Sequence, residues 1–321
     1  MRFFLFSVIS LLVHLLSAAD VRLTVTVVDD CGNPVSNAVV VVQTLKSLVS
    51  GCGSRPDHFL WASNSTDGAG IARIQFRCLT ADFSCYVAAE NHYPEKNLHG
   101  RFRARENSNL AMDFLDTATN LSFTLYRKIN PTPMYSHDLV ERRKIPSDNG
   151  RWGYDLQIGD WVSPFGKGLT SDFLLEFHLL QTDTAFECHG GLVFESPYEG
   201  CYRLRRNGSQ VMQTVYAADT NGIFVTNLCF RSRLDLQDHS RSFRETLLDE
   251  NEYLVLRTRV KTDKEGNVVS ANYSKIFGPI KFQRRYFELR QTTFNPNVND
   301  PNLESDPSRN LNRNLFGGGL P

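Results

Sequence analysis

The chain has 321 residues, of which 35 are basic and 35 acidic, so its formal net charge is zero. This balance gives no support to recognition of nucleic acid or of an anionic membrane surface, both of which favour basic proteins. Beyond the N-terminal segment no stretch is long and apolar enough to cross a bilayer, so we expect no transmembrane anchor.

The first 19 residues have the organisation of a secretory signal peptide. Arg2 supplies a positive charge, residues 3–16 form a largely apolar run, and Ser17-Ala18-Ala19 offers the small residues of a cleavage site. The apolar run is shorter than the roughly 20 residues of a membrane-spanning helix. We therefore expect cleavage near Ala19 and a mature protein that is secreted, periplasmic or at the cell surface.

Residues 20–127 alternate between apolar and polar in short runs with turn signals between them, which is typical of an all-β sandwich. The turns are Asp30-Cys31-Gly32-Asn33-Pro34 and Ser65-Thr66-Asp67-Gly68-Ala69-Gly70, where Gly, Asn and Pro suit tight backbone angles. We expect strands at residues 21–27, 35–44, 71–76, 86–89 and 121–125.

The two turns and their flanking strands carry a resemblance. The motif is Val25-x-Val27-x-Asp29-x-x-Gly32-x-Pro34-Val35-x-x-Ala38-x-Val40, followed by Thr66-Asp67-x-x-Gly70. Over residues 20–127 the chain resembles the carboxypeptidase regulatory-like (transthyretin-like) and bacterial Ig-like modules. The resemblance implies a Greek-key β-sandwich, and members of that group are typically non-catalytic spacers, supports or docking modules.

Composition changes after this region. Residues 128–150 contain three prolines and a charged group, which favours a linker. Residues 151–294 again show evenly spaced strand patterns, including a hairpin around Asp263-Lys264-Glu265-Gly266-Asn267, and predict a second β-sandwich-like domain of unknown function. This half resembles an uncharacterised domain of exported bacterial proteins, through the motif Gly159-Asp160-Trp161-Val162-x-Pro164-x-Gly166-Lys167-Gly168. The polar residues 295–321 predict an extended or disordered tail.

All seven cysteines follow the predicted signal peptide, and export to an oxidising compartment favours disulfides. Cys78 and Cys85 flank a short loop between two predicted strands, so we expect a bridge between them. Cys31 and Cys52 then form a pair by elimination. Cys188, Cys201 and Cys229 leave one cysteine over, and no Cys/His spacing indicates a zinc site.

No established catalytic motif is present in the sequence. A catalytic pair of carboxylates remains an open alternative, because glycosidase acids come together from distant strands. The candidates for such a pair are Asp155, Asp160 and Asp172. Each of the three also stands where an aspartate serves a turn or a strand end.

Aromatic and oxygen-rich segments give two candidate ligand sites. Trp152 and Trp161, with Trp61, are candidates for stacking against sugar rings, although tryptophans in sandwiches more often belong to the core. A run of oxygen ligands could hold calcium, but Pro301 stands where a calcium loop needs glycine. We expect no cofactor and no metal, with calcium as the open alternative; its candidate ligands are Asn297, Asn299, Asp300, Asn302, Glu304 and Asp306.

These observations favour an exported, non-catalytic binding or structural protein that recognises carbohydrate or a cell-envelope protein. In this hypothesis the first domain supports the second β domain, which does any binding. The alternative is a polysaccharide-degrading enzyme with its site in the second domain and the first domain as an accessory. A third hypothesis is a purely structural component that assembles with other exported proteins.

Overall fold

The computed structural model describes residues 19–312, except for 46–58, 79–80, 102–103, 107–111, 115–116, 138–140, 206–214, 236–242, 246–247, 250–251 and 284–285. The predicted signal peptide up to residue 18 lies outside the described residues. Cys52 does too. In the part that is described, no helix is long and apolar enough to span a membrane.

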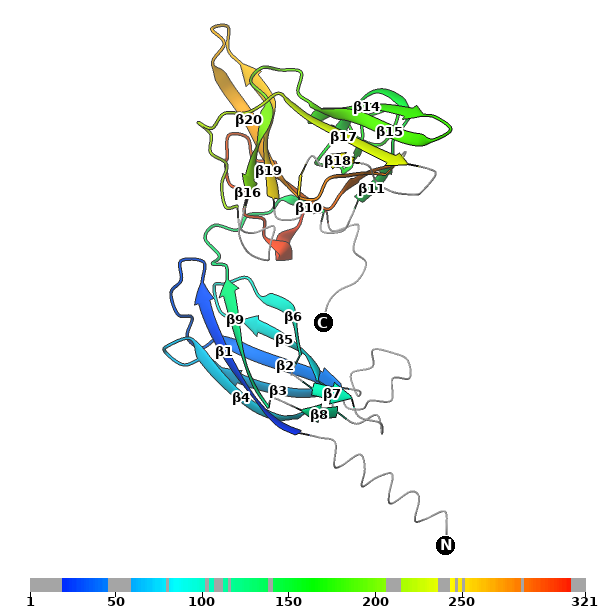
Figure 1. Cartoon of the computed structure of the whole chain (residues 1–321). Helices are drawn as coiled ribbons and strands as arrows, with labels where there is room; N and C mark the ends of the chain where they lie inside the picture. Colours follow the sequence, from blue (N-terminus) through cyan, green and yellow to red (C-terminus); the bar gives the residue numbers. More distant parts are fainter. Residues whose placement is uncertain are drawn as a thin grey trace. The chain divides into compact units, whose positions relative to one another are not determined.

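The chain divides into two compact units, residues 1–128 and 129–321 (Figure 1). Strands make up nearly all of the regular structure, and a single 3-10 turn, Pro307–Arg309, is the only helical element among the described residues. The predicted all-β class is therefore confirmed.

The first unit is a β-sandwich, blue to blue-green in Figure 1. Its smaller sheet has the strand order β4 (Ile71–Cys78), β1 (Ala19–Asp29) and β9 (Ala118–Leu125). Its larger sheet has the order β3 (Phe59–Ser65), β2 (Val39–Leu45), β5 (Asp82–Ala88) and β6 (Glu95–Arg101). A separate two-stranded ladder joins β7 (Ala104–Glu106) to β8 (Met112–Phe114).

Alternation along the strands builds the core of this unit. On β1 the side chains of Val21, Leu23, Val25 and Val27 are buried, while the residues between them are not. They share one apolar cluster with side chains from both sheets. Because period-two alternation sends every second side chain to one face, each sheet contributes one face to this core.

The residues of the N-terminal motif hold the turns of the first unit. Asp29 Oδ1 accepts hydrogen bonds from the backbone N–H groups of Cys31 and Asn33, both at 2.8 Å. Asp67 Oδ1 accepts from the N–H groups of Ala69 and Ile71, both at 3.0 Å, in the same arrangement. Aspartate therefore satisfies the backbone donors of both turns.

Gly70 shows why the motif requires glycine. Its φ is +73°, and a Cβ placed on it would lie 2.4 Å from the carbonyl oxygen of Val27. The Gly70 carbonyl in turn accepts from the Val27 N–H at 2.8 Å. Only a residue without a side chain fits this close approach at a left-handed backbone angle.

The described residues of the second unit form three sheets, green to red in Figure 1. The six-stranded sheet has the order β13 (Asp160–Trp161), β12 (Asn149–Asp155), β14 (Phe173–Gln181), β15 (Ala185–Val193), β17 (Asn227–Asp235) and β18 (Phe243–Glu245). The five-stranded sheet has the order β10 (Tyr135–His137), β23 (Gln291–Phe294), β20 (Val268–Phe277), β19 (Glu252–Thr262) and β16 (Gly200–Arg205). The three-stranded sheet has the order β11 (Glu141–Lys144), β22 (Tyr286–Leu289) and β21 (Lys281–Gln283).

An aromatic core joins the sheets of the second unit. Tyr154 lies 5.4 Å from Phe173 and 5.6 Å from Phe287, measured between ring centroids. These rings come from β12, β14 and β22, so one cluster contacts both the six-stranded and the three-stranded sheet.

The segment 128–150 is not a linker. From Ile129 onward it belongs to the second unit, where it supplies β10, β11 and the start of β12. Met134 and Ile145 in it are fully buried. Its prolines and charges fit the linker pattern, but residues 135–137 and the charged group 141–144 pair with strands that come more than 100 residues later.

The tail predicted from residue 295 is also part of the fold up to residue 312. Asn295, Leu303 and Glu304 are buried. Both carboxylate oxygens of Glu304 accept backbone N–H groups, from Ile129 at 3.0 Å and from Asn130. The polar composition that suggested disorder supplies the hydrogen bonds that attach this segment.

Candidate functional site

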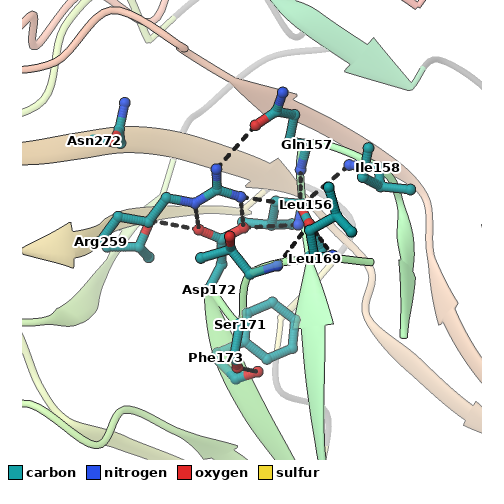
Figure 2. Close-up of polar contacts among 12 residues, drawn as sticks. Leu156, Gln157, Ile158, Leu169, Ser171, Asp172, Phe173, Arg259 and Asn272 are labelled. Atoms are coloured by element: carbon teal, nitrogen blue, oxygen red, sulfur yellow. Dashed lines mark hydrogen bonds and ion pairs between the residues drawn. The ribbon is translucent and has the colours of Figure 1, made fainter. Parts of the chain in front are cut away.

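The second unit contains a buried charged centre formed by Asp155, Asp172 and Arg259. Arg259 binds Asp172 through a fork, with Nε to Oδ1 at 2.9 Å and Nη2 to Oδ2 at 3.0 Å. Nη2 also reaches Asp155 Oδ1 at 3.0 Å, and Nη1 donates to Gln157 Oε1 at 2.9 Å. Figure 2 shows the guanidinium between Asp172 and Gln157. Such bidentate pairs are the strong form of the ion pair.

Two strand ends and an irregular position inside a third strand hold these side chains. Asp155 is the last residue of β12, and Asp172 directly precedes β14. Arg259 lies in β19 where the pairing with β20 shifts register, and its φ of +53° is unusual for a residue with a side chain. Its guanidinium also lies 4.3 Å from the ring centroid of Phe294. A bulge of this kind re-aims a side chain, here towards the two aspartates.

The carboxylates of the centre are completely occupied. Asp172 accepts four hydrogen bonds: Thr258 Oγ1 and Arg259 donate to Oδ1, and the Leu156 N–H and Arg259 donate to Oδ2. Asp155 Oδ2 accepts the N–H groups of Leu169 and Thr170. Its Oδ1 accepts those of Gln157 and Ile158 besides Arg259. Every oxygen of the two carboxyl groups is therefore engaged by donors within the protein.

Burial sets the electrostatics of the centre. It raises the pKa of Asp172, against the hydrogen bonds and charge of Arg259, which act to lower it. Burial acts to lower the pKa of Arg259, but its bonds to Asp172 and Asp155 outweigh this and raise that pKa. Nearby, burial also raises the pKa of Glu199, whose Oε1 accepts the Val260 N–H at 3.0 Å. Through the hydrogen bonds of Asp155 and Asp172, the centre connects the segment 156–170 to Arg259 on β19.

Asp160, the third carboxylate singled out in the sequence, does not join the centre. Its Oδ1 accepts the Trp161 N–H at 2.9 Å, and its Oδ2 accepts the Lys167 N–H at 3.1 Å. Gly166 lies close to it, since a Cβ there would be 2.8 Å from Asp160 Cγ. Asp160 therefore closes the loop of the Gly-Asp-Trp motif.

The prediction that Trp152 and Trp161 bind a ligand is wrong. They are 5% and 2% exposed and belong to the aromatic core of the second unit. Trp161 Nε1 donates to the Lys144 carbonyl at 2.8 Å, and its ring lies 5.3 Å from that of Tyr154. The Gly-rich sequence around them resembles a surface loop, but strand pairing turns both indoles inward.

The third tryptophan, Trp61, lies on the surface of the first unit. It is 59% exposed, and the ring of Phe59 contacts it edge-on at 6.3 Å between centroids. On the larger sheet, Trp61 of β3 pairs with Gln43 of β2. In the next row, Val41 of β2 lies between Ser63 of β3 and Tyr86 of β5. These side chains alternate with the buried core residues of β2 and β5, so they share the outward side of the larger sheet. We call Phe59, Trp61, Gln43, Val41 and Tyr86 the outer aromatic face.

The cysteines differ from the predicted disulfides. Cys85 carries a free thiol, so the predicted bridge to Cys78 is absent, and the Cys78 thiol lies 3.4 Å from Thr44 Oγ1. Cys31 is exposed and free, and its predicted partner Cys52 lies outside the described residues. Burial raises the pKa of Cys85 to about 12.

The candidate calcium segment uses its oxygens within the protein. Asn295 Nδ2 donates to Asp300 Oδ2, the Asn302 N–H donates to Asp300 Oδ1, and Asp306 binds Ser308 and Arg309. Elsewhere in the described chain, Asp29, Asp30 and Cys31 are the only three candidate metal ligands with donor atoms within 4.8 Å of one another. Arg127 occupies that group, with Nε 2.7 Å from Asp30 Oδ1 and Nη2 2.9 Å from Cys31 Sγ.

The fold and these sites define an all-β protein of two compact units. No protein-family profile matches the chain, and no curated protein matches its sequence. Among solved structures it is similar to 3-chlorocatechol 1,2-dioxygenase from Rhodococcus opacus 1CP, at 13% identity over 34% of this chain and 60% of that one, with a TM-score of 0.24.

Two further structures are similar at the same level. The Bacillus anthracis TIE protein is 8% identical over 84% of this chain and 48% of that one, with a TM-score of 0.22. A DUF3823 family protein from Parabacteroides merdae ATCC 43184 is 10% identical over 74% of this chain and 90% of that one, with a TM-score of 0.16. Similarity at these TM-scores carries no argument about function.

Proposed function

We propose that the protein is an exported, non-catalytic binding protein that recognises polysaccharide through the outer aromatic face of its first unit. The observation that carries this proposal is the 59% exposure of Trp61 beside Phe59. An indole in water leaves a large apolar surface unburied, and this one shares a side of the sheet with the partly buried rings of Phe59 and Tyr86. Export is supported by the signal-like sequence of residues 1–19.

The chemistry of the outer aromatic face suits a sugar chain. The indole of Trp61 and the ring of Phe59 offer apolar surfaces to the C–H side of a pyranose ring. The Gln43 amide and the Tyr86 hydroxyl, on the same side of the sheet, offer donors and acceptors for sugar hydroxyl groups. A pleated sheet presents these groups on a broad surface, which favours an extended β-linked glycan over a compact or coiled one.

We also propose that the first unit is a carboxypeptidase regulatory-like module. Support comes from the paired roles of Asp29 and Asp67, which accept two backbone N–H groups each, and from the close approach of Gly70 to Val27. These are residues of the motif on which the resemblance is based. Modules of that kind typically support or dock rather than catalyse.

The alternative is a polysaccharide-degrading enzyme with its site in the second unit. Such an enzyme needs one carboxyl group that donates a proton to the glycosidic oxygen and a second that acts as nucleophile or base. Asp155 and Asp172 lie together, but each of their four oxygens already accepts at least two hydrogen bonds. This geometry favours a structural role for the pair.

A binding assay with matched variants tests the proposal. The chain is incubated with insoluble cellulose and chitin and screened against soluble polysaccharides, and bound protein is measured. We expect Trp61→Ala to abolish binding. Ile223→Ala is the control, because Ile223 is 86% exposed in the second unit and lies outside the outer aromatic face. Equal binding by wild type and Trp61→Ala would refute the role of this face.

A further inference from the structure

Two histidines face each other on the outer surface of the six-stranded sheet. His178 on β14 lies directly opposite His189 on β15, and their rings stack with centroids 5.1 Å apart and planes 24° apart. His189 is exposed, and the His178 side chain is 39% exposed. Neighbouring Leu179 and Cys188 point to the opposite, core side of the sheet. Both imidazoles are therefore accessible from solvent on a rigid strand pair.

A carboxylate orients one of the two rings. His178 Nε2 lies 3.2 Å from Glu176 Oε1, and Glu176 Oε2 is held by Arg151 Nη2 at 2.7 Å. This contact leaves Nδ1 as the atom of His178 that can face an ion. A histidine that ligates a metal characteristically gives its other ring nitrogen to a carboxylate, which fixes the ring and makes it a better ligand.

We propose that His178 and His189 form a two-histidine site for a divalent transition-metal ion, Cu²⁺ or Zn²⁺, with Glu176 as the positioning residue of His178. Imidazole nitrogen is a preferred ligand of these ions. With metal–nitrogen bonds of about 2.0–2.1 Å, a shared ion needs the two nitrogens about 3.3 Å apart in tetrahedral geometry. Directly opposite residues have Cβ atoms about 4.5–5.5 Å apart, so small rotations of the two rings reach that distance. Water completes the coordination.

The charges around the pair tolerate a cation. Arg231 lies opposite His189 on β17, but its Nη2 and Nε bind Glu187 Oε1 at 2.6 and 3.0 Å. Arg151 is paired with Glu176. Each of these two arginines is therefore matched by a carboxylate. Arg233, opposite Glu187 on β17, also acts on that carboxylate.

Cys229 supplies the control that separates imidazole from thiolate binding. It is exposed on β17, two residues from Arg231, on the same side of the sheet as His189. Residues in this diagonal relation are about 7–8 Å apart, farther than the directly opposite histidines. A thiolate site would depend on Cys229, whereas the proposed site does not.

The test is a titration of the tag-free chain with Cu²⁺ and with Zn²⁺ by calorimetry, together with electron paramagnetic resonance of the Cu²⁺ sample. We expect one equivalent of Cu²⁺ with nitrogen hyperfine coupling, and loss of this site in the double variant His178→Ala/His189→Ala. Glu176→Gln is expected to weaken binding about tenfold, as loss of an outer-shell carboxylate does. Cys229→Ser is expected to bind as wild type, and thermal unfolding checks that each variant is folded. Wild-type affinity in the double variant, loss of binding in Cys229→Ser, or no binding by wild type would each overturn the proposal.

Discussion

Arg259 and Asp172 form a two-point ion pair in the second unit, although they lie 87 residues apart in the sequence. The Asp172 side chain is fully buried and the Arg259 side chain is 19% exposed. Arg259 reaches Asp172 from a backbone position with φ of +53°. Two strands of different sheets, and the loop that Asp155 holds, therefore meet at one guanidinium.

Removing the guanidinium should destabilise the second unit strongly. In Arg259→Gly the backbone angle is retained without strain, since glycine tolerates positive φ. The loss in free energy of unfolding therefore measures the contribution of the Arg259 side chain. We expect about 3–5 kcal/mol of destabilisation, because two buried carboxylates lose their cation. Urea unfolding measures this change. The control is Arg231→Ala, whose exposed pair with Glu187 should contribute about 0–1 kcal/mol. Similar losses in the two variants would contradict a structural role for the centre.

Substitution of a buried and of an exposed tryptophan should have different effects on the free energy of unfolding. Trp161→Ala removes an indole that is 2% exposed and bonded to Lys144, so we expect a loss of about 3–5 kcal/mol. Trp61→Ala should change the free energy of unfolding by less than about 0.5 kcal/mol, because its side chain is on the surface. Chemical denaturation of both variants provides the measurement. A stable Trp161→Ala protein would argue against the buried position of this residue.

The turn at Asp29 should make the first unit sensitive to acid. Burial acts to raise the pKa of Asp29, but hydrogen bonds from Asn33 and Cys31 and the charge of Arg127 outweigh it and lower that pKa. A carboxylate with a lowered native pKa stabilises the fold above its unfolded value of about 3.9 and loses this contribution as the pH falls through the native value.

The comparison of wild type with Asp29→Asn measures this effect. The advantage of wild type in free energy of unfolding should be constant above about pH 5 and should shrink below about pH 4. A difference that stays the same down to about pH 2 would mean that the ionised form of Asp29 contributes nothing.

Thiol accessibility should follow burial. Burial raises the pKa of Cys201 to about 12 and that of Cys188 to about 11, while Cys31 and Cys229 are exposed. Because the thiolate is the reactive form, iodoacetamide should modify Cys31 and Cys229 well before Cys85, Cys188 and Cys201 in the folded chain. Mass spectrometry of timed samples checks this order. A peptide that links Cys78 to Cys85 under non-reducing conditions would instead restore the disulfide expected from the sequence.

Local patterns predicted the strands and turns well. The alternation around Val21–Val27 and the turn at Asp263–Asn267 both appear in the structure, the latter with Gly266 at a φ of +86°. Such features depend on neighbours in the sequence. Alternation identifies which side chains share a face, and turn residues reveal their own backbone angles.

Features that depend on distant partners could not be predicted in this way. Nothing near Asp155 or Asp172 indicates that Arg259 lies between them. Trp152 has the composition of a binding loop around it, and only its pairing with Leu175 shows that it faces the core. The polar composition of the segment around Glu304 suggested disorder. In the structure its hydrogen-bond acceptors satisfy the backbone of Ile129 and Asn130, which lie 175 and 174 residues earlier in the sequence.

The exposed ring of Trp61 is the basis of the proposed function, and one comparison tests it most directly. The binding of wild type, Trp61→Ala and Ile223→Ala to insoluble cellulose and chitin is measured at equal concentration of folded protein. We predict that wild type and Ile223→Ala bind alike and that Trp61→Ala stays in solution. Binding of Trp61→Ala at the wild-type level, or no binding of wild type to any polysaccharide in the screen, would contradict a glycan-binding role for the outer aromatic face.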